Sequence, residues 1–337
     1  MEVLHAADRS RQSAGEAARA IVAPPARSLL ARILASRSVW ISLAVVLVAA
    51  FVPFYFSAYI LGLLTIAFYF GVFSMSWDLL FGFANEVNFG PTFLIGLGAY
   101  TAGMLNYNLG VPVPICIAAG AVMAVVGGVV LALPALRVRG PYFGLTTLVA
   151  VLMLQNFIVV GAHFTGGEDG LMVPDVISID ASTNYWIALG FMTVSGAILF
   201  GLSRSPVGLI LQASGQDAVQ AGALGFNVVK HKLAAFIISA FFSGLSGALL
   251  MFYLTSATPG TFVDVTIGVQ VIIAAVLGGR RTILGAAIGA VFLIGMGEAL
   301  RPLGDLATFI VSAIALVVVL LFPSGLLGLL TRTKEAL

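Results

Sequence analysis

The chain has 337 residues, of which 60% are hydrophobic and only 9% are charged, and its mean hydropathy is +1.10. No water-soluble domain of this length can hide so many apolar side chains in a core. The composition therefore excludes a soluble protein and indicates an integral membrane protein. The single cysteine, Cys116, excludes an internal disulfide.

The first 38 residues differ from the rest of the chain. They mix Ala, Ser and Arg with Pro24-Pro25 and show no sustained apolar period. This composition predicts a disordered cytoplasmic arm whose Arg side chains rest on anionic lipid. Residues 39–330 then form the expected transmembrane domain, and residues 331–337 the expected cytoplasmic tail.

Apolar runs of about twenty residues recur along the chain and match the roughly 30 Å hydrocarbon thickness of a bilayer. Because lipid cannot satisfy backbone polar groups, these runs predict helices, and the fold class is all-α integral membrane. The ten expected transmembrane helices are 39–57, 59–81, 88–106, 112–133, 141–162, 185–203, 232–256, 265–279, 283–300 and 305–322.

The basic residues indicate which side of the membrane each loop faces, because Lys and Arg are retained on the cytoplasmic side. With ten spans, only Arg301 of the 16 basic residues lies opposite the N-terminal arm, so both termini are predicted to be cytoplasmic. The net charge of +2 then results from a basic cytoplasmic face and an acidic opposite face, not from one basic surface, so we exclude nucleic acid as a partner. Spans 2–5 and 7–10 would form inverted four-helix units, a plan typical of alternating access.

Gly and Pro cluster where the third and ninth spans begin, at 88–92 and 278–282. Non-helical backbone at membrane depth persists only when it is buried in protein or lines a wet cavity, so either segment could be a broken helix near a pathway. The alternative is an ordinary turn at the membrane interface. We favour the turn for 278–282, where Arg280 and Arg281 suit lipid headgroups, and leave both interpretations open for 88–92.

Three acidic residues, Asp78, Glu86 and Glu298, lie in or beside the spans. A carboxylate at the centre of a bilayer costs about 2.5–3.5 kcal/mol on insertion scales, so it would be kept there only for use, for example in ion coupling. Each of the three lies near a predicted span end, where solvation at the interface is the preferred explanation. Glu86, beside Asn85 and Asn88, is the first candidate if the chain is instead a secondary transporter driven by an ion gradient.

Residues 203–232 interrupt the hydrophobic pattern with helix-capping chemistry. Ser205 can cap a helix that has Pro206 at its first position. Ser214-Gly215-Gln216-Asp217 fits a capping box, and Gly225 can take the left-handed conformation that ends a helix. We therefore predict a second short helix over 214–225, outside the bilayer.

The inventory of reactive residues argues against an enzyme. The three His residues show no metal-ligand spacing, and no lysine follows a glycine as a phosphate-binding loop requires. The chain therefore hydrolyses no ATP alone, and we expect it to hold no cofactor. The glycine-rich turn 165–170 in the acidic external loop 163–184 lacks calcium-ligand spacing, and its acidity suits docking of an external protein.

An ordered set of motifs between Trp77 and Gly328 resembles the inner-membrane permeases of branched-chain amino acid ABC importers, specifically the LivM-like subunit. The most specific segment is Leu136-Arg137-Val138-Arg139-Gly140-Pro141-Tyr142-Phe143 followed by Thr146-Thr147-Leu148. Other matches include Gly96-Leu97-Gly98-Ala99-Tyr100, Ala223-Leu224-Gly225, Leu277-Gly278-Gly279 and Phe322-Pro323.

The resemblance implies a type-II-importer-like permease of the bacterial inner membrane. Its partners would be a homologous second permease, two cytoplasmic ATPase subunits that bind ATP and Mg²⁺, and a periplasmic solute-binding protein. The loop 203–232 would hold the coupling helices, with candidate coupling residues Ser205, Gly208, Ser214, Gly215, Gln216, Asp217, Ala218 and Gly225. The candidate pathway residues are Glu86, Asn88, Gly90, Thr92, Tyr142, Thr146 and Thr147.

The chain departs from the family pattern at two places. Ser214-Gly215-Gln216-Asp217 replaces the usual Arg and Glu of the coupling stretch, and Asn85-Glu86 and Pro91 replace a usual Gly-Gln pair and His. The solute is thus a branched-chain amino acid, or else urea, a short amide or an aromatic compound. A membrane scaffold that moves no solute is a third functional class.

Overall fold

The computed structural model describes residues 37–136 and 141–304, together with the separate positions 306, 309–311, 313, 314, 317 and 325. Most of the predicted N-terminal arm, most of the tenth span and the C-terminal tail lie outside the described residues. So do residues 137–140, which carry part of the family-like segment before the fifth span.

The described chain is almost entirely helical, as the sequence predicts. Its elements are α3 (Arg37–Phe51), η1 (Val52–Phe54), α4 (Ala58–Asp78), η2 (Leu79–Phe83), α5 (Pro91–Leu109), α6 (Val113–Ala135), α7 (Pro141–Val160), α8 (Ala162–Thr165), β1 (Leu171–Met172), α9 (Ala181–Arg204), α10 (Pro206–Gln216), α11 (Ala218–Ala223), α12 (Val228–Leu254), β2 (Ser256–Ala257), α13 (Pro259–Phe262), α14 (Val265–Gly278), α15 (Leu284–Leu300) and η3 (Arg301–Leu303). The two short strands pair antiparallel, with Leu171 opposite Ala257.

The long helices coincide with the first nine of the ten predicted spans. Seven helical stretches in the described part of the chain are long and apolar enough to cross a membrane. The first predicted span is shorter than expected, because α3 ends at Phe51 and a turn of 3₁₀-helix containing Pro53 follows. The prediction of an all-α membrane protein is thus confirmed for the part of the chain that the structure describes.

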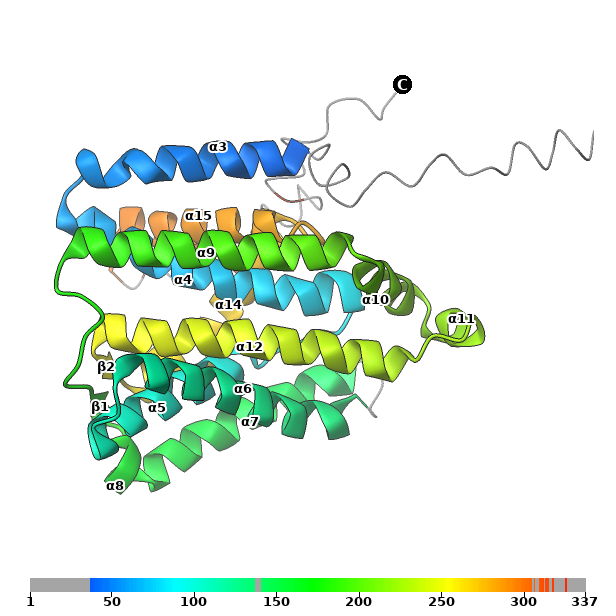
Figure 1. Cartoon of the computed structure of the whole chain (residues 1–337), viewed down its shortest axis with the longest axis horizontal. Helices are drawn as coiled ribbons and strands as arrows, with labels where there is room; N and C mark the ends of the chain where they lie inside the picture. Colours follow the sequence, from blue (N-terminus) through cyan, green and yellow to red (C-terminus); the bar gives the residue numbers. More distant parts are fainter. Residues whose placement is uncertain are drawn as a thin grey trace, which may run out of the picture. The chain divides into compact units, whose positions relative to one another are not determined.

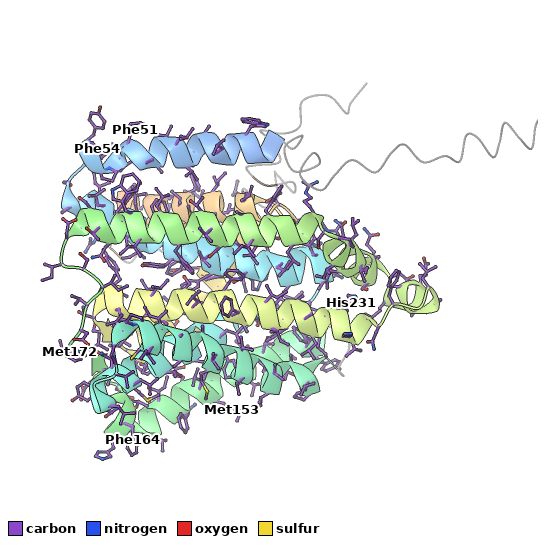
Figure 2. The ribbon with its side chains drawn as sticks, in the orientation of Figure 1. Phe51, Phe54, Met153, Phe164, Met172 and His231 are labelled. Carbon is purple, nitrogen blue, oxygen red and sulfur yellow. The ribbon has the colours of Figure 1, made fainter. Side chains whose placement is uncertain are left out.

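Two groups of helices pack side by side (Figure 1). Helix α12 packs along α5 and α6, whereas α4 packs along α9, α14 and α15, and α4 and α12 contact each other. The second half of α4 is buried on all sides and supplies core side chains such as Tyr69, Phe73 and Trp77. Other apolar side chains project outward, including Phe51 of α3 and Met153 of α7 (Figure 2), as expected of helices that face lipid or a partner.

Small residues allow the backbones of α5, α6 and α12 to meet directly. A Cβ added at Gly98 of α5 would lie 2.1 Å from the carbonyl oxygen of Gly244 in α12, and one added at Gly120 of α6 would lie 2.5 Å from the carbonyl oxygen of Gly98. Close approach through small residues is the usual way for membrane helices to pack, since lipid provides no hydrophobic force between them.

The loop between α8 and α9 begins with a tight turn over 165–170, as predicted. Gly166, Gly167 and Gly170 all have positive φ, and the Gly170 N–H bonds to the Gly166 carbonyl at 3.2 Å. Asp180 then caps α9. A hydrogen bond from the Thr183 hydroxyl, together with one from the Thr183 backbone N–H, lowers the pKa of the Asp180 carboxyl.

Candidate functional site: the coupling region and the start of α5

The first capping prediction in the coupling region is confirmed. Ser205 is the N-cap of α10, its hydroxyl accepts from the Gly208 N–H at 3.5 Å, and Pro206 occupies the first helical position. A Cβ added at Gly208 would lie 2.2 Å from the Ser203 carbonyl oxygen. Glycine is therefore required where the chain turns sharply from α9 into α10.

The predicted helix over 214–225 is wrong at its start. Helix α10 continues through Ser214 to Gln216, and the Ser214 hydroxyl is buried without a hydrogen-bond partner among the described residues. The cap is Asp217, whose carboxylate accepts from the N–H groups of Val219 and Gln220, both at 2.9 Å. Ser and Asp are equally good caps, and the choice falls on Asp217 because Ser214 lies on the face of α10 that packs on the bundle.

The predicted helix end is confirmed. Gly225 has φ of +88°, its N–H bonds to the Gly222 carbonyl at 2.9 Å, and the Phe226 N–H bonds to the Ala221 carbonyl at 3.2 Å. These two bonds make a Schellman motif, which requires the left-handed residue. Helix α11 is therefore a short rod with a defined cap at each end.

The candidate coupling residues differ in what they face. A Cβ added at Gly215 would lie 2.6 Å from the Phe83 carbonyl oxygen, so Gly215 is a packing contact between α10 and the end of η2. Gln216 and Ala218 are exposed. Helix α11 lies beyond the ends of the membrane helices (Figure 1) and exposes two apolar side chains, Val219 at 77% and Leu224 at 75%.

Four of the candidate pathway residues, Asn88, Gly90, Thr92 and Thr147, lie together at the start of α5. The Asn88 side chain accepts from the Gly90 N–H at 2.8 Å, and a Cβ added at Gly90 would lie 2.1 Å from the Thr147 carbonyl oxygen. The Trp77 indole donates to the Asn88 carbonyl at 2.7 Å. Trp77 lies six residues before the end of η2, so the segment that leads into α5 packs beside the last turn of α4.

Asn88 and Gly90 are buried, and the backbone is non-helical up to Pro91, where α5 begins, so the geometry favours the interpretation of 88–92 as a broken helix. The helix that follows has Gly90 as N-cap and no side-chain cap. The Thr92 hydroxyl in its first turn is fully buried and has no hydrogen-bond partner in the described part of the chain. Segment 278–282, by contrast, is a turn between α14 and α15, as we favoured.

Tyr142 and Thr146 lie apart from these residues, on the outer face of α7. Tyr142 is 63% exposed, and the Thr146 hydroxyl donates to the Tyr142 carbonyl at 2.9 Å. Farther along the same face is an open groove of about 430 Å³. It is lined by Val149, Leu152, Met153, Asn156, Phe157 and Val160.

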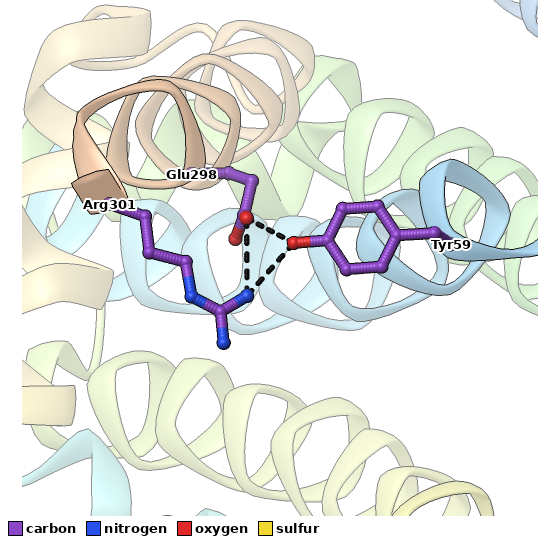
Figure 3. Close-up of polar contacts among 3 residues, drawn as sticks. All are labelled: Tyr59, Glu298 and Arg301. Atoms are coloured by element: carbon purple, nitrogen blue, oxygen red, sulfur yellow. Dashed lines mark hydrogen bonds and ion pairs between the residues drawn. The ribbon is translucent and has the colours of Figure 1, made fainter.

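Each of the three acidic candidates for ion coupling has a partner. Glu86 Oε1 lies 2.5 Å from Lys232 Nζ of α12, and both side chains are 16% exposed. Glu298 pairs with Arg301 at 3.2 Å and accepts a hydrogen bond from Tyr59 (Figure 3).

Asp78 shows that the interface interpretation is wrong for this residue. It is 1% exposed, and its carboxylate accepts from the backbone N–H groups of Arg281 at 3.0 Å and Ile283 at 2.9 Å. Each of the three carboxylates thus has a bonded partner, which explains its presence without ion coupling.

The sequence did not reveal the cluster that these contacts form around residues 78–90. Besides Lys232, it includes Arg280, whose guanidinium donates to the Asn85 side chain at 2.5 Å and lies 4.4 Å from the centre of the Phe81 ring. Arg281 Nε donates to the Gly82 carbonyl at 2.8 Å. The partners are 146 to 199 residues apart in sequence, and no local pattern marks such a pairing.

A bundle of helices that are long and apolar enough to cross a membrane indicates a multi-pass membrane protein. Residues 59–323 match the family described as the permease component of the branched-chain amino acid transport system, and the chain belongs to this family. The resemblance in the sequence is thereby confirmed.

Several relatives carry the same kind of name. The chain is 24% identical over 318 residues to the high-affinity branched-chain amino acid transport system permease protein LivM of Escherichia coli K12, a match that covers 84% of this chain and 73% of the relative. It is 27% identical over 198 residues to the corresponding LivH protein of Salmonella typhimurium, covering 52% and 60%. It is also 25% identical over 232 residues to the ribose import permease protein RbsC of Haemophilus influenzae, covering 66% and 70%. No solved structure matches the chain.

Proposed function

We propose that this chain is the permease subunit of an ABC importer that moves branched-chain or related amino acids across a bacterial inner membrane. Transport would proceed by alternating access, driven by two ATPase subunits that bind ATP and Mg²⁺ on the cytoplasmic side. The observation that carries the proposal is α11, a capped helix with exposed apolar residues at one end of a membrane bundle that belongs to a transport permease family.

The chemistry of α11 suits docking into a cleft of an ATPase subunit. Exposed Val219 and Leu224 can be buried there, and each fully buried side chain of this size contributes about 1.5–3 kcal/mol. The two caps hold the helix rigid, so that less conformational entropy is lost on docking. Arg204 and Lys232 flank this region, in agreement with a cytoplasmic location for it and for both termini.

The helix packing supports the proposed inverted units. If α4 is exchanged with α12, α5 with α14 and α6 with α15, the packing pattern is kept: α12 packs on α5 and α6, and α4 on α14 and α15. In each unit non-helical backbone comes before a helix that starts at a proline: α5 starts at Pro91, and the short α13 starts at Pro259, six residues before α14 begins at Val265. The unit that begins with α12 would be completed by the predicted tenth span.

The outer face of α7 suits the homologous second permease. Exposed Tyr142, Leu145, Val149, Leu152 and Asn156 follow one another at intervals of three and four residues, the spacing of a helix that packs on another helix. Asn156 is a polar residue on this exposed face, and such residues in membrane helices usually face a partner or a cavity rather than lipid. We propose that the pathway lies near the buried start of α5, where Thr92 offers a hydroxyl that has no partner among the described residues.

Transport by purified components tests the proposal. The chain is reconstituted in proteoliposomes with candidate second permease, ATPase subunits and solute-binding protein, and uptake of radiolabelled leucine is followed, with urea and benzoate as alternative solutes. We expect uptake only when ATP, the ATPase subunits and the binding protein are all present. Uptake by the chain alone under a proton or sodium gradient would instead establish a secondary transporter. If no solute is taken up with any partner, the protein would be a membrane scaffold that moves no solute.

Docking of α11 is tested separately. Val219→Asp or Leu224→Asp should prevent co-purification of the ATPase subunits, because a carboxylate cannot be buried in an apolar cleft without a partner. Val219→Leu keeps the apolar surface and serves as the matched control. Normal co-purification of both aspartate variants would show that α11 does not dock.

A further inference from the structure

We propose that the ion pair between Glu86 and Lys232 is the link that carries movement of the coupling region, α10 and α11, to the buried start of α5. Both are positioning residues that neither bind solute nor contact ATP. This inference rests on the proposed function, since it assigns the route by which ATPase closure would reach the pathway.

Lys232 is the residue of the pair that would move with the coupling region. Helix α12 begins at Val228, four residues before Lys232, and α11 ends at Ala223. The connection between the two helices is short and held at both ends, by the Schellman motif at Gly225 and by the Asn227 side chain, which accepts from the Lys230 N–H at 3.0 Å. A displacement of α11 therefore moves the first turn of α12 as well, because no flexible loop separates the two helices.

A second contact joins the coupling region to the same segment. Gly215 of α10 packs so closely on the end of η2 that an added Cβ would lie 2.6 Å from the Phe83 carbonyl oxygen and 3.0 Å from the Ala84 carbonyl carbon. Helix α10 thus contacts residues 83 and 84 directly, and α11 acts on Glu86 through the first turn of α12 and the ion pair.

Glu86 is the residue of the pair that would move the start of α5. Its N–H bonds to the Leu80 carbonyl at 3.2 Å, and four residues later Gly90 caps α5. The residues between are pinned, because the Asn88 side chain binds the Gly90 N–H and the Thr147 hydroxyl accepts from the Phe89 N–H at 3.0 Å. Movement of Glu86 is therefore transmitted to the cluster of buried residues at the start of α5.

The opposite side of the segment is anchored to the turn between α14 and α15. Asp78 holds the N–H groups of Arg281 and Ile283, and Arg281 in return holds the Gly82 carbonyl. Ile283 has φ of +49°, an unfavourable conformation for a β-branched residue that persists only where its surroundings impose it. Between anchor and link lies η2, a single π-helical turn, and such turns occur frequently at functional sites.

The burial of the pair makes it an effective link. Both side chains are 16% exposed, so salt screens their attraction less than that of a surface pair. Removing one partner leaves the other charge partly buried without compensation, whereas reversing both charges retains the attraction.

The test uses the full complex in proteoliposomes and measures how strongly the solute-loaded binding protein stimulates ATP hydrolysis. We expect Glu86→Gln and Lys232→Met each to reduce this stimulation at least fivefold, about the lower limit of typical coupling free energies between sites. Each single variant should lower the melting temperature, because it leaves one partly buried charge unpaired, whereas assembly with the ATPase subunits and basal ATP hydrolysis should stay at wild-type levels. Lys230→Met, at an exposed lysine two residues away, should behave as the wild type. The double variant Glu86→Lys with Lys232→Glu should regain most of the lost stimulation.

The outcomes separate the link from the function on which it rests. If the wild type shows no stimulation with any partner set, the proposed function fails. If the wild type is stimulated and the single variants match it, the link is overturned. Loss in both single variants without recovery in the charge reversal would also overturn it, because a mere loss of packing or charge at either site would then explain the effect.

Discussion

Asp217 is the residue on which the structure of α11 depends most. Its carboxylate accepts two backbone N–H groups at 2.9 Å, at the start of a helix of only six residues. Replacing an N-cap of this kind by alanine costs about 1 kcal/mol, and the interaction of a carboxylate with the helix dipole adds about 0.3–1 kcal/mol. Asp217→Ala should therefore destabilise α11 by about 1–2 kcal/mol, which corresponds to a roughly 5- to 30-fold change in the ratio of folded to frayed helix.

Two measurements check this magnitude. Hydrogen exchange at the amides of Ala221 and Leu224, whose acceptors are the backbone carbonyls of Asp217 and Gln220, should accelerate by the same factor in Asp217→Ala, and stimulated ATP hydrolysis by the complex should fall with it. Asn caps helices as well as Asp does, so Asp217→Asn should retain most of both properties. Unchanged exchange in Asp217→Ala would refute the capping argument. An Asn variant as impaired as the Ala variant would show that a charge contact, not the cap, is what matters.

Two further predictions follow from exposure and from helix packing. Ile179→Cys, at a position 96% exposed, should react with an impermeant maleimide from the periplasmic side, and Val219→Cys only from the cytoplasmic side. The buried Cys116 should give no background labelling. Labelling of both introduced cysteines from one side would contradict the proposed topology. Gly98→Ala should destabilise the protein in detergent by about 1–3 kcal/mol, because its methyl group would overlap a backbone carbonyl of α12, whereas Gly190→Ala, whose methyl group meets nothing within 4 Å, should leave the melting temperature unchanged.

The membrane helices could be predicted because their signal is local. Each span needs enough consecutive apolar residues to cross the hydrocarbon layer, and Gly or Pro marks its ends. The same logic located Gly90 and Pro91 as a break, and Ser205, Pro206 and Gly225 as helix ends, all of which the structure bears out. These features depend on a few neighbouring residues.

The contacts of the candidate site could not be predicted because they join residues that are far apart in the chain. Nothing near Asp78 indicates that it holds the backbone of Ile283, or that Ile283 adopts a positive φ. The cap of α11 was predicted at the wrong residue for the same reason, because the choice between Ser214 and Asp217 depends on which face of α10 the bundle covers. Local sequence ranks the possible caps, and tertiary packing selects among them.

The polar contacts divide the bundle into parts that can move relative to each other. Helix α4 is tied to α15 at both ends, by Tyr59 with Glu298 and Arg301 (Figure 3), and by Asp78 at the turn before α15. Hydrogen bonds between α4 and α12 lie within the bundle, from Ser76 to Ser243, from Ser246 to the Tyr69 carbonyl, and between Thr65 and Tyr253.

Helices α4 and α15 are thus expected to move as one body, and α12, α6 and the middle of α5, whose backbones meet directly at Gly98, Gly120 and Gly244, as another. The start of α5 is bonded instead to Trp77 of α4, through the Asn88 carbonyl. Alternating access would then occur at the contact between α4 and α12, which is apolar apart from these few bonds and can slide at little cost. The Glu86–Lys232 pair lies at one end of that contact, where it joins the segment that extends α4 to the first turns of α12. A charge pair at that position can bias the sliding without being part of either body's core, which is why we assign transmission to it rather than to the more deeply buried Asp78.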